Sequence, residues 1–348
     1  MSTSTRPPDL THVPPTRSDD PPGRVARAAP WLAGAWVVTY LPMALLHLVR
    51  DTPPPWTPTP ASVLLALSAA QASVLIIVLG SLAAVSLGAS TARGGAASRP
   101  AAWLLVVVGL VVSLAVSDVR ALSFVGYAPM MVLALLGVGP MADASVDGAV
   151  YTDSLLALGS SIGGIGMVVT GAGLLARRTG AVLFRTPGSA LRIGRWAVGV
   201  AALVPLCYAV TRLAWAVGIP LGVRDEFLDE LGSAKWAGFG LAAFAVVGCL
   251  LTLGLVQRWG EVFWSWVPLV GGRPVPVGMA VVPALFVATI VTSAGLAFDA
   301  AVLGGHLEEL PGAEQDWAAW APELLWPVWG AALAVAALAY RSRRAVTR

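Results

Sequence analysis

The chain alternates between long apolar blocks and shorter segments that carry most of its charge. Within the blocks, ionisable side chains are rare. Each block is about as long as the roughly 20 helical residues needed to cross about 30 Å of hydrocarbon. The blocks are 31–49, 61–87, 101–117, 121–139, 155–176, 196–219, 236–257, 275–303 and 324–340.

Only helices or closed barrels satisfy their backbone groups inside a bilayer, and blocks of this length are helical. The fold class is therefore all-α, a polytopic transmembrane helical bundle. Composition agrees, since 57% of the residues are hydrophobic and 12% are charged. An ordinary soluble domain has about 25% charged residues. Tryptophans open several blocks, as in an interfacial belt: Trp31, Trp103, Trp196, Trp236, Trp326 and Trp329.

The orientation of the second half follows from arginine in short loops, which favours the cytoplasmic side. Segment 177–195 is basic and contains no acid, and the chain then alternates between acidic and basic loops. The basic residues are Arg177, Arg178, Arg185, Arg192, Arg195, Arg258, Arg273, Arg341, Arg343, Arg344 and Arg348. The acidic residues of the outer loops are Asp225, Glu226, Asp229, Glu230, Glu308, Glu309, Glu314 and Asp316.

The first half contains one conflict. Loop 140–153 has three aspartates and no base, so it should be external, while the arginines before residue 100 should be cytoplasmic. Residues 101–139 must then cross an odd number of times. We expect 101–120 to span and 121–139, broken by Pro129, to be a re-entrant or peripheral segment on the outer side. This gives eight spanning helices; nine, with the N-terminal tail outside, is the alternative.

Eight spans divide the chain into two sets of four, a candidate 4+4 tandem repeat. Ser98-Arg99-Pro100 recurs as Gly272-Arg273-Pro274 before the corresponding helix. We expect a disordered cytoplasmic tail (1–29), an N-terminal transmembrane half (30–176), a basic linker (177–195), a C-terminal transmembrane half (196–341) and a basic tail (342–348). In the segment 159–166, small residues lie four apart, which predicts close helix packing.

Arg212 is the most informative ionisable residue, because it lies within a spanning block. Such residues are functional candidates. Arg212 would contact an anion in a cavity, or form an ion pair that holds helices together, or extend to the outer interface. Its candidate partners are Asp118, Asp299 and the acids of the outer loops.

The other candidate pathway residues lie near helix ends. Three of them, Asp118, Arg120 and Asp299, lie at the outer ends of helices. A charged side chain costs little free energy there, so a solvated or paired structural role is favoured. If the repeat is real, Asp118 and Asp299 occupy equivalent places, and two facing carboxylates would relay protons or act as an acid/base pair. His47 is the only histidine in an apolar block, which argues against a bis-histidine haem.

The loop between blocks 236–257 and 275–303 combines arginine with tryptophan, which suits the cytoplasmic headgroup region. It is an interfacial anchor or a contact for a lipid headgroup or partner. Its candidate residues are Arg258, Trp259, Glu261, Trp264, Trp266 and Arg273. This loop, together with 208–222 and 251–256, resembles a group of bacterial polytopic membrane proteins of unknown function. The resemblance implies a helical membrane architecture and no particular activity.

We expect function to lie in the bundle, its rims or the tail, because no other segment is long enough for a soluble domain. The leading hypothesis is a small-solute or ion transporter of a bacterial cell membrane, with an unknown substrate. The alternatives are a structural or regulatory protein that binds other membrane proteins, and an enzyme acting on lipid-linked substrates. No motif indicates a catalytic centre, a cofactor, a metal site or a nucleic-acid partner. The expected surroundings are the lipid bilayer.

Overall fold

The computed structural model describes residues 24–56, 62–91, 98–138, 148–179, 184, 186–309, 312 and 315–346. The long helices are α1 (Arg24–Arg50), α2 (Ala69–Thr91), α3 (Ser98–Val111), α4 (Val119–Leu135), α5 (Gly148–Thr179), α6 (Pro187–Ala216), α8 (Lys235–Gly254), α9 (Val277–Leu303) and α10 (Trp326–Val346). A short helix α7 (Asp225–Leu231) precedes α8. Most of the expected N-terminal tail and of loop 140–153 lies outside the described residues.

Eight helices of the described chain are long and apolar enough to cross a membrane. This confirms the prediction of a polytopic helical bundle with eight spans. Residues 24–29 belong to α1 rather than to a tail, and Ala29 is buried. Helix α6 begins at Pro187, inside the segment expected to be a linker, where Thr186 and Ser189 form a capping box.

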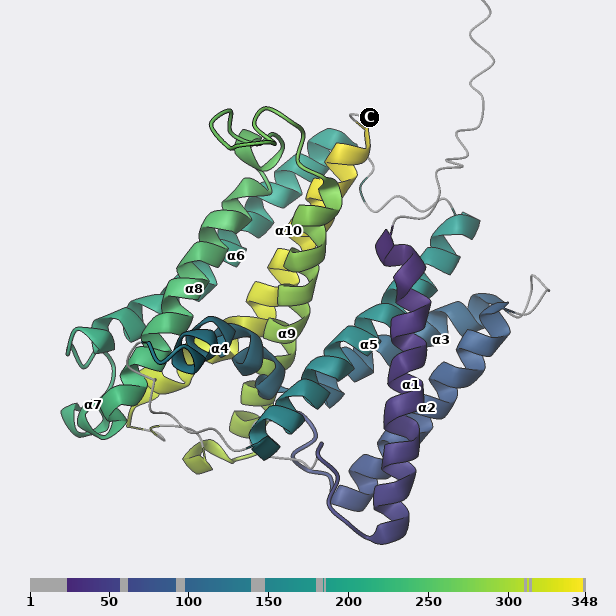
Figure 1. Ribbon diagram of the computed structural model, residues 1–348, viewed down its shortest axis with the longest axis horizontal. Helices are drawn as coiled ribbons and strands as arrows, with labels where there is room; N and C mark the ends of the chain where they lie inside the picture. Colours follow the sequence, from purple (N-terminus) through teal and green to yellow (C-terminus); the bar gives the residue numbers. More distant parts are fainter. Residues whose placement is uncertain are drawn as a thin grey trace, which may run out of the picture.

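The third span ends in a π-helical turn, η1 (Val112–Val116), instead of continuing to residue 120. Asp118 then caps α4 by accepting a hydrogen bond from the backbone N–H of Arg120 at 2.9 Å. Helix α4 lies across the C-terminal half, not along it (Figure 1). The segment was expected to be broken by Pro129, but α4 runs through that residue. Proline removes one helical hydrogen bond and kinks a helix without always ending it.

The spanning helices form two groups of four, which lie side by side in Figure 1. In the N-terminal half, α1 packs on α2, α2 on α3, α3 on α5 and α5 on α1, so the ring is closed. In the C-terminal half, α6 packs on α8 and α10, and α10 packs on α9. Among the described residues, α8 and α9 do not pack along each other. Three of the four neighbour relations therefore match, and the tandem duplication stays a prediction.

Helix α4 joins the two halves. Its residues Ala121, Leu122 and Val125 pack with Ala157 and Leu158 of α5 and with Phe286 and Ile290 of α9. On its other side it reaches α8, where a side chain added at Gly126 would collide with Leu241 and one added at Gly240 would collide with Met130. Helix α4 thus covers the space between α8 and α9 over part of their length.

The two ends of the bundle differ in charge. We call the end that holds residues 258–276 and the last turns of α10 the basic end, and the opposite end, with α7 and residues 304–325, the acidic end (Figure 1). Of the ionisable residues whose side chains the structure describes, one carboxylate, Glu261, lies at the basic end, among ten arginines. These are Arg24, Arg27, Arg99, Arg192, Arg195, Arg258, Arg273, Arg341, Arg343 and Arg344.

The glycines of α5 allow close contact with two neighbouring helices, as their spacing predicted. A Cβ atom on Gly164 would lie 2.5 Å from the carbonyl oxygen of Gly109 in α3. One on Gly166 would lie 2.8 Å from the carbonyl oxygen of Ala29 in α1. Small residues at such crossings let the backbones approach and gain dispersion energy.

We predict that Gly164→Ala lowers the stability of the bundle by about 1–3 kcal/mol, because α3 must move away from α5. The control is Gly173→Ala in the same helix, where an added Cβ meets no atom within 4 Å. It should leave stability unchanged or slightly higher. Thermal unfolding in detergent, followed by circular dichroism, measures both. Equal effects of the two substitutions would contradict the close contact.

Candidate functional site

Arg212 lies one turn from the acidic end of α6 and is almost fully buried. Its Nη2 atom is 2.6 Å from Oε1 of Glu323. The same guanidinium donates to the carbonyl oxygens of Ala318, at 2.7 Å, and Ala319, at 3.0 Å. Both terminal nitrogens of Arg212, Nη1 and Nη2, therefore donate hydrogen bonds to protein atoms. The partner of Arg212 is Glu323, an acid of the outer loop before the last span, and not Asp118 or Asp299.

Aromatic rings cover the remaining surface of the Arg212 guanidinium. Its Cζ atom lies 4.5 Å from the ring centre of Tyr208 and 4.2 Å from that of Trp215. These distances are within the range of cation–π attraction, which is stronger when the cation is removed from water. The arrangement matches the interpretation of Arg212 as an ion pair that holds helices together, since α6 and the chain before α10 share one buried pair.

The carbonyl groups that receive Arg212 are positioned by a second ion pair. Residues 317–319 form a single 3₁₀ turn, and Asp316 before it is fully buried. Its carboxylate accepts from the backbone N–H of Arg224 at 2.7 Å and from Nη2 of the same residue at 2.8 Å. Hydrogen bonds from the Arg224 side chain hold the pKa of Asp316 below its ordinary value of 3.8. The pair ties the loop before α7 to the loop before α10.

Asp118 and Arg120 form a third polar cluster, at the junction of the two halves. Arg120 Nη2 is 2.6 Å from the Asp118 carboxylate, and its Nη1 is 3.3 Å from that of Asp153 in α5. Nη1 also donates to the carbonyl oxygen of Pro55. Nearby, Ser293 of α9 donates to the carbonyl oxygen of Ser117 at 2.7 Å. The cluster connects α4 to α5, to α9 and to the chain after α1.

Asp299 and His47 take no part in these clusters. Asp299 is partly exposed on α9, and within the described chain no ion pair involves it. The side chain of Asp118 pairs with Arg120 instead, so no contact between the two aspartates supports a proton relay. His47 hydrogen-bonds Thr52 at 2.9 Å, and its ring meets the edge of Trp56. It lies at the end of α1, as an interfacial residue does.

The loop between α8 and α9 is a folded unit, which we call the tryptophan loop (residues 258–276). Phe263 donates to the carbonyl oxygen of Arg273, and Val275 donates to that of Glu261, so the two arms of the loop pair. Its tryptophans form a ladder: the ring centres of Trp259 and Trp264 are 5.6 Å apart, and so are those of Trp264 and Trp266.

The last turns of α10 fasten the tryptophan loop to the bundle. Arg343 pairs with Glu261 at 3.0 Å, and Arg344 donates to the carbonyl oxygen of Glu261 at 2.9 Å. Tyr340 donates to the carbonyl oxygen of Gly260 at 2.8 Å. Arg258 and Arg273 are exposed, and no ion pair involves them within the described chain. The loop therefore presents two guanidinium groups beside three tryptophans.

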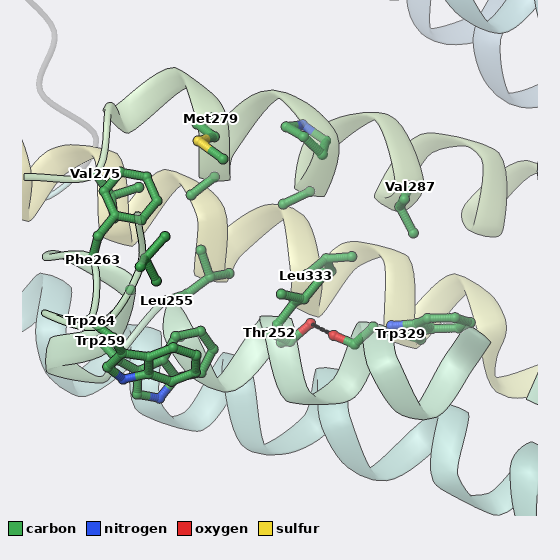
Figure 2. Close-up of a pocket in the computed structure, with 18 of the residues that line it drawn as sticks. Thr252, Leu255, Trp259, Phe263, Trp264, Val275, Met279, Val287, Trp329 and Leu333 are labelled. Atoms are coloured by element: carbon green, nitrogen blue, oxygen red, sulfur yellow. Dashed lines mark hydrogen bonds between the residues drawn. The ribbon is translucent and has the colours of Figure 1, made fainter. Parts of the chain in front are cut away.

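A cleft of about 550 Å³ lies between α8 and α9, beneath the tryptophan loop. Figure 2 looks into it, with α9 on one side, α8 on the other and Leu333 and Trp329 of α10 behind. Its walls are almost entirely apolar, and the Thr252 hydroxyl donates to the carbonyl oxygen of Gly248. The lining residues are Gly248, Leu251, Thr252, Gly254, Leu255, Trp259, Gly260, Phe263, Trp264, Trp266, Val267, Val275, Met279, Ala280, Pro283, Ala284, Val287, Trp329 and Leu333.

The cleft opens sideways onto the surface that would face lipid. Leu251 and Met279 line it on opposite sides and have 64% and 61% of their surface exposed. It lies at the basic end, where α8 and α9 fail to pack. Toward the acidic end, Val119 and Leu122 of α4 belong to the same apolar cluster as Leu241 and Val246 of α8 and Val291 of α9. A lipid-facing, mostly apolar cavity of this size suits a hydrophobic ligand.

Two parts of these sites were not named from the sequence: Glu323 as the individual outer-loop acid that pairs with Arg212, and the cleft. Glu323 directly precedes the last apolar block, and its position at the edge of a span was a usable signal for the partner of Arg212. The cleft had no comparable signal, because it depends on which helices fail to touch. Among the described residues, no group of histidine, cysteine, aspartate and glutamate side chains is arranged to hold a metal ion.

We predict that Glu323→Gln lowers stability by about 3–5 kcal/mol, because Arg212 is left as an uncompensated buried charge. The double variant Arg212→Met/Glu323→Gln should lose less than the sum of the single losses. Asp225→Asn, at an exposed acid of α7, is the control and should change stability by less than about 0.5 kcal/mol. Unfolding in detergent measures the cycle, and strictly additive losses would show that the pair does not couple.

Comparison of the chain with protein-family models, with curated proteins and with solved structures found no match.

Proposed function

We propose that this multi-pass membrane protein binds a lipid, with one hydrocarbon chain held in the cleft between α8 and α9. The cleft itself carries the proposal. It is apolar, it lies in the spanning part of the molecule, and it opens toward the surface that contacts the hydrocarbon. Few side chains that line the cleft could form hydrogen bonds with a polar solute.

The dimensions of the cleft fit one leaflet. On α9 its walls extend from Met279 to Val287, which at 1.5 Å per residue is about 12 Å. Half of a hydrocarbon core of about 30 Å is about 15 Å. A lipid of the nearer leaflet, with its headgroup at the tryptophan loop, would place one chain along the cleft.

A helix of a partner protein fits less well. A helix with side chains is about 10–12 Å across. The walls of the cleft run for little more than two helical turns on α9, which is much shorter than a spanning helix. An extended chain uses the length of the cleft, and this favours a lipid over the alternative of a structural protein that receives a partner's helix.

The basic end belongs in the cytoplasm under this proposal, because arginine is retained on that side. The bound lipid then comes from the cytoplasmic leaflet of the cell membrane. Transport of a small solute or ion stays a prediction. It was supported by the helix count, the possible repeat and Arg212, and the Arg212 side chain is occupied by Glu323, two carbonyl groups and two rings. Modification of a lipid-linked substrate would require reactive groups beside the cleft.

Filling the cleft tests the proposal. A Cβ atom on Gly248 meets no atom within 4 Å, and Gly248 lines the cleft. We expect Gly248→Phe to fold and to place its ring where the chain would lie. Gly199→Phe is the matched control, since Gly199 is an exposed helical glycine of α6 with equally open surroundings.

The measurement is photocrosslinking of the full chain, reconstituted in nanodiscs, to a phospholipid with a diazirine in its acyl chain. We expect labelled peptides from 248–287 in the wild type and in Gly199→Phe, and at least tenfold less labelling there in Gly248→Phe. Such a loss corresponds to about 1.4 kcal/mol or more. Equal labelling in all three proteins would refute a bound chain in the cleft.

A further inference from the structure

Two arginines, Arg258 and Arg273, lie close in sequence to residues at the end of the apolar cleft. Arg258 directly precedes Trp259, and Arg273 lies two residues before Val275; both Trp259 and Val275 line the cleft. The two arginines come from opposite arms of the tryptophan loop, which pair through the bridge between Val262 and Pro274. Two cationic residues therefore adjoin residues that line the cleft, at its end beneath the tryptophan loop.

Within the described part of the chain, acidic side chains do not engage these two arginines. The single acid of the tryptophan loop, Glu261, is engaged by Arg343 at 3.0 Å. Arg343 and Arg344 both hold backbone carbonyl groups of the loop or of the adjoining helix. Arg258 and Arg273, by contrast, have exposed side chains with no ion pair within the described part of the chain.

The arginines also sit on a rigid support. The loop is paired along its arms, and its tryptophan rings stack with an angle of 18° between Trp264 and Trp266. Trp266 is 73% exposed, and tryptophans with this exposure favour the headgroup level of a membrane. At that depth the negative charges are lipid phosphates, and arginine binds phosphate with paired, directed hydrogen bonds.

We infer that Arg258 and Arg273 select the lipid in the cleft by its headgroup, binding the phosphate of an anionic phospholipid such as phosphatidylglycerol. This inference rests on the proposed function, since it needs a chain in the cleft beneath the headgroup. The apolar walls bind any chain of suitable length, and the arginines add the preference for negative charge.

The test is a competition between two photoactivatable lipids with the same diazirine chain, one with a phosphatidylglycerol and one with a phosphatidylcholine headgroup. Each arginine near a charged lipid surface contributes about 1 kcal/mol, so we expect the wild type to prefer phosphatidylglycerol roughly five- to thirty-fold in labelling of 248–287. In Arg258→Gln/Arg273→Gln the ratio should fall close to one. Labelling by phosphatidylcholine should persist and shows that the cleft is intact.

The matched control is Arg341→Gln. It removes an exposed arginine of α10 at the same, basic end of the bundle and leaves the tryptophan loop unchanged. Its preference should stay that of the wild type. Equal labelling by both lipids in the wild type would overturn the headgroup inference, and so would a preference that survives in the double variant. In either case, labelling of 248–287 would still support the proposed function. No labelling of 248–287 by either lipid overturns both.

Discussion

Helices α8 and α9 do not pack on each other, and the arrangement of the C-terminal half follows from how the space between them is filled. Protein interiors are close-packed, and in lipid a gap between helices must be covered by other protein or by hydrocarbon. Toward the acidic end α4 covers it, with glycine contacts at Gly126 and Gly240 that bring it near α8. Toward the basic end the gap remains as the cleft. The N-terminal half has no corresponding gap to be covered by another helix or by lipid, because α2 packs directly on α3.

Ion pairs among the described residues connect separate segments of this protein. Arg212 and Glu323 join α6 to the start of the last span, Arg224 and Asp316 join two loops, and Arg120 joins the halves. A buried arginine without its acid would be costly. A single intramembrane arginine is therefore a weak indicator of transport until its partners are known. Arg258 and Arg273 are exposed, take part in no ion pair within the described residues, and adjoin residues that line the cleft.

Much of the fold could be predicted from the distribution of apolar residues. The blocks beginning at Trp31 and Trp196 are spanning helices, and arginine placement separates the two ends. The packing of Gly164 on Gly109 was likewise predictable from spacing. The path of α4 was predicted only as peripheral or re-entrant, because Pro129 does not disclose whether a helix breaks. The pairing of Arg212 with Glu323 and the cleft depend on distances between segments far apart in the chain, which periodicity does not encode.

The most direct test of a lipid-filled gap is an experimental structure in lipid nanodiscs, for example by cryo-electron microscopy with a bound antibody fragment. We predict separated α8 and α9 at the basic end, with continuous density for an extended chain between Met279 and Thr252, ending beneath the tryptophan loop. Helices α8 and α9 packed side by side, with the cleft closed and no such density, would contradict the account.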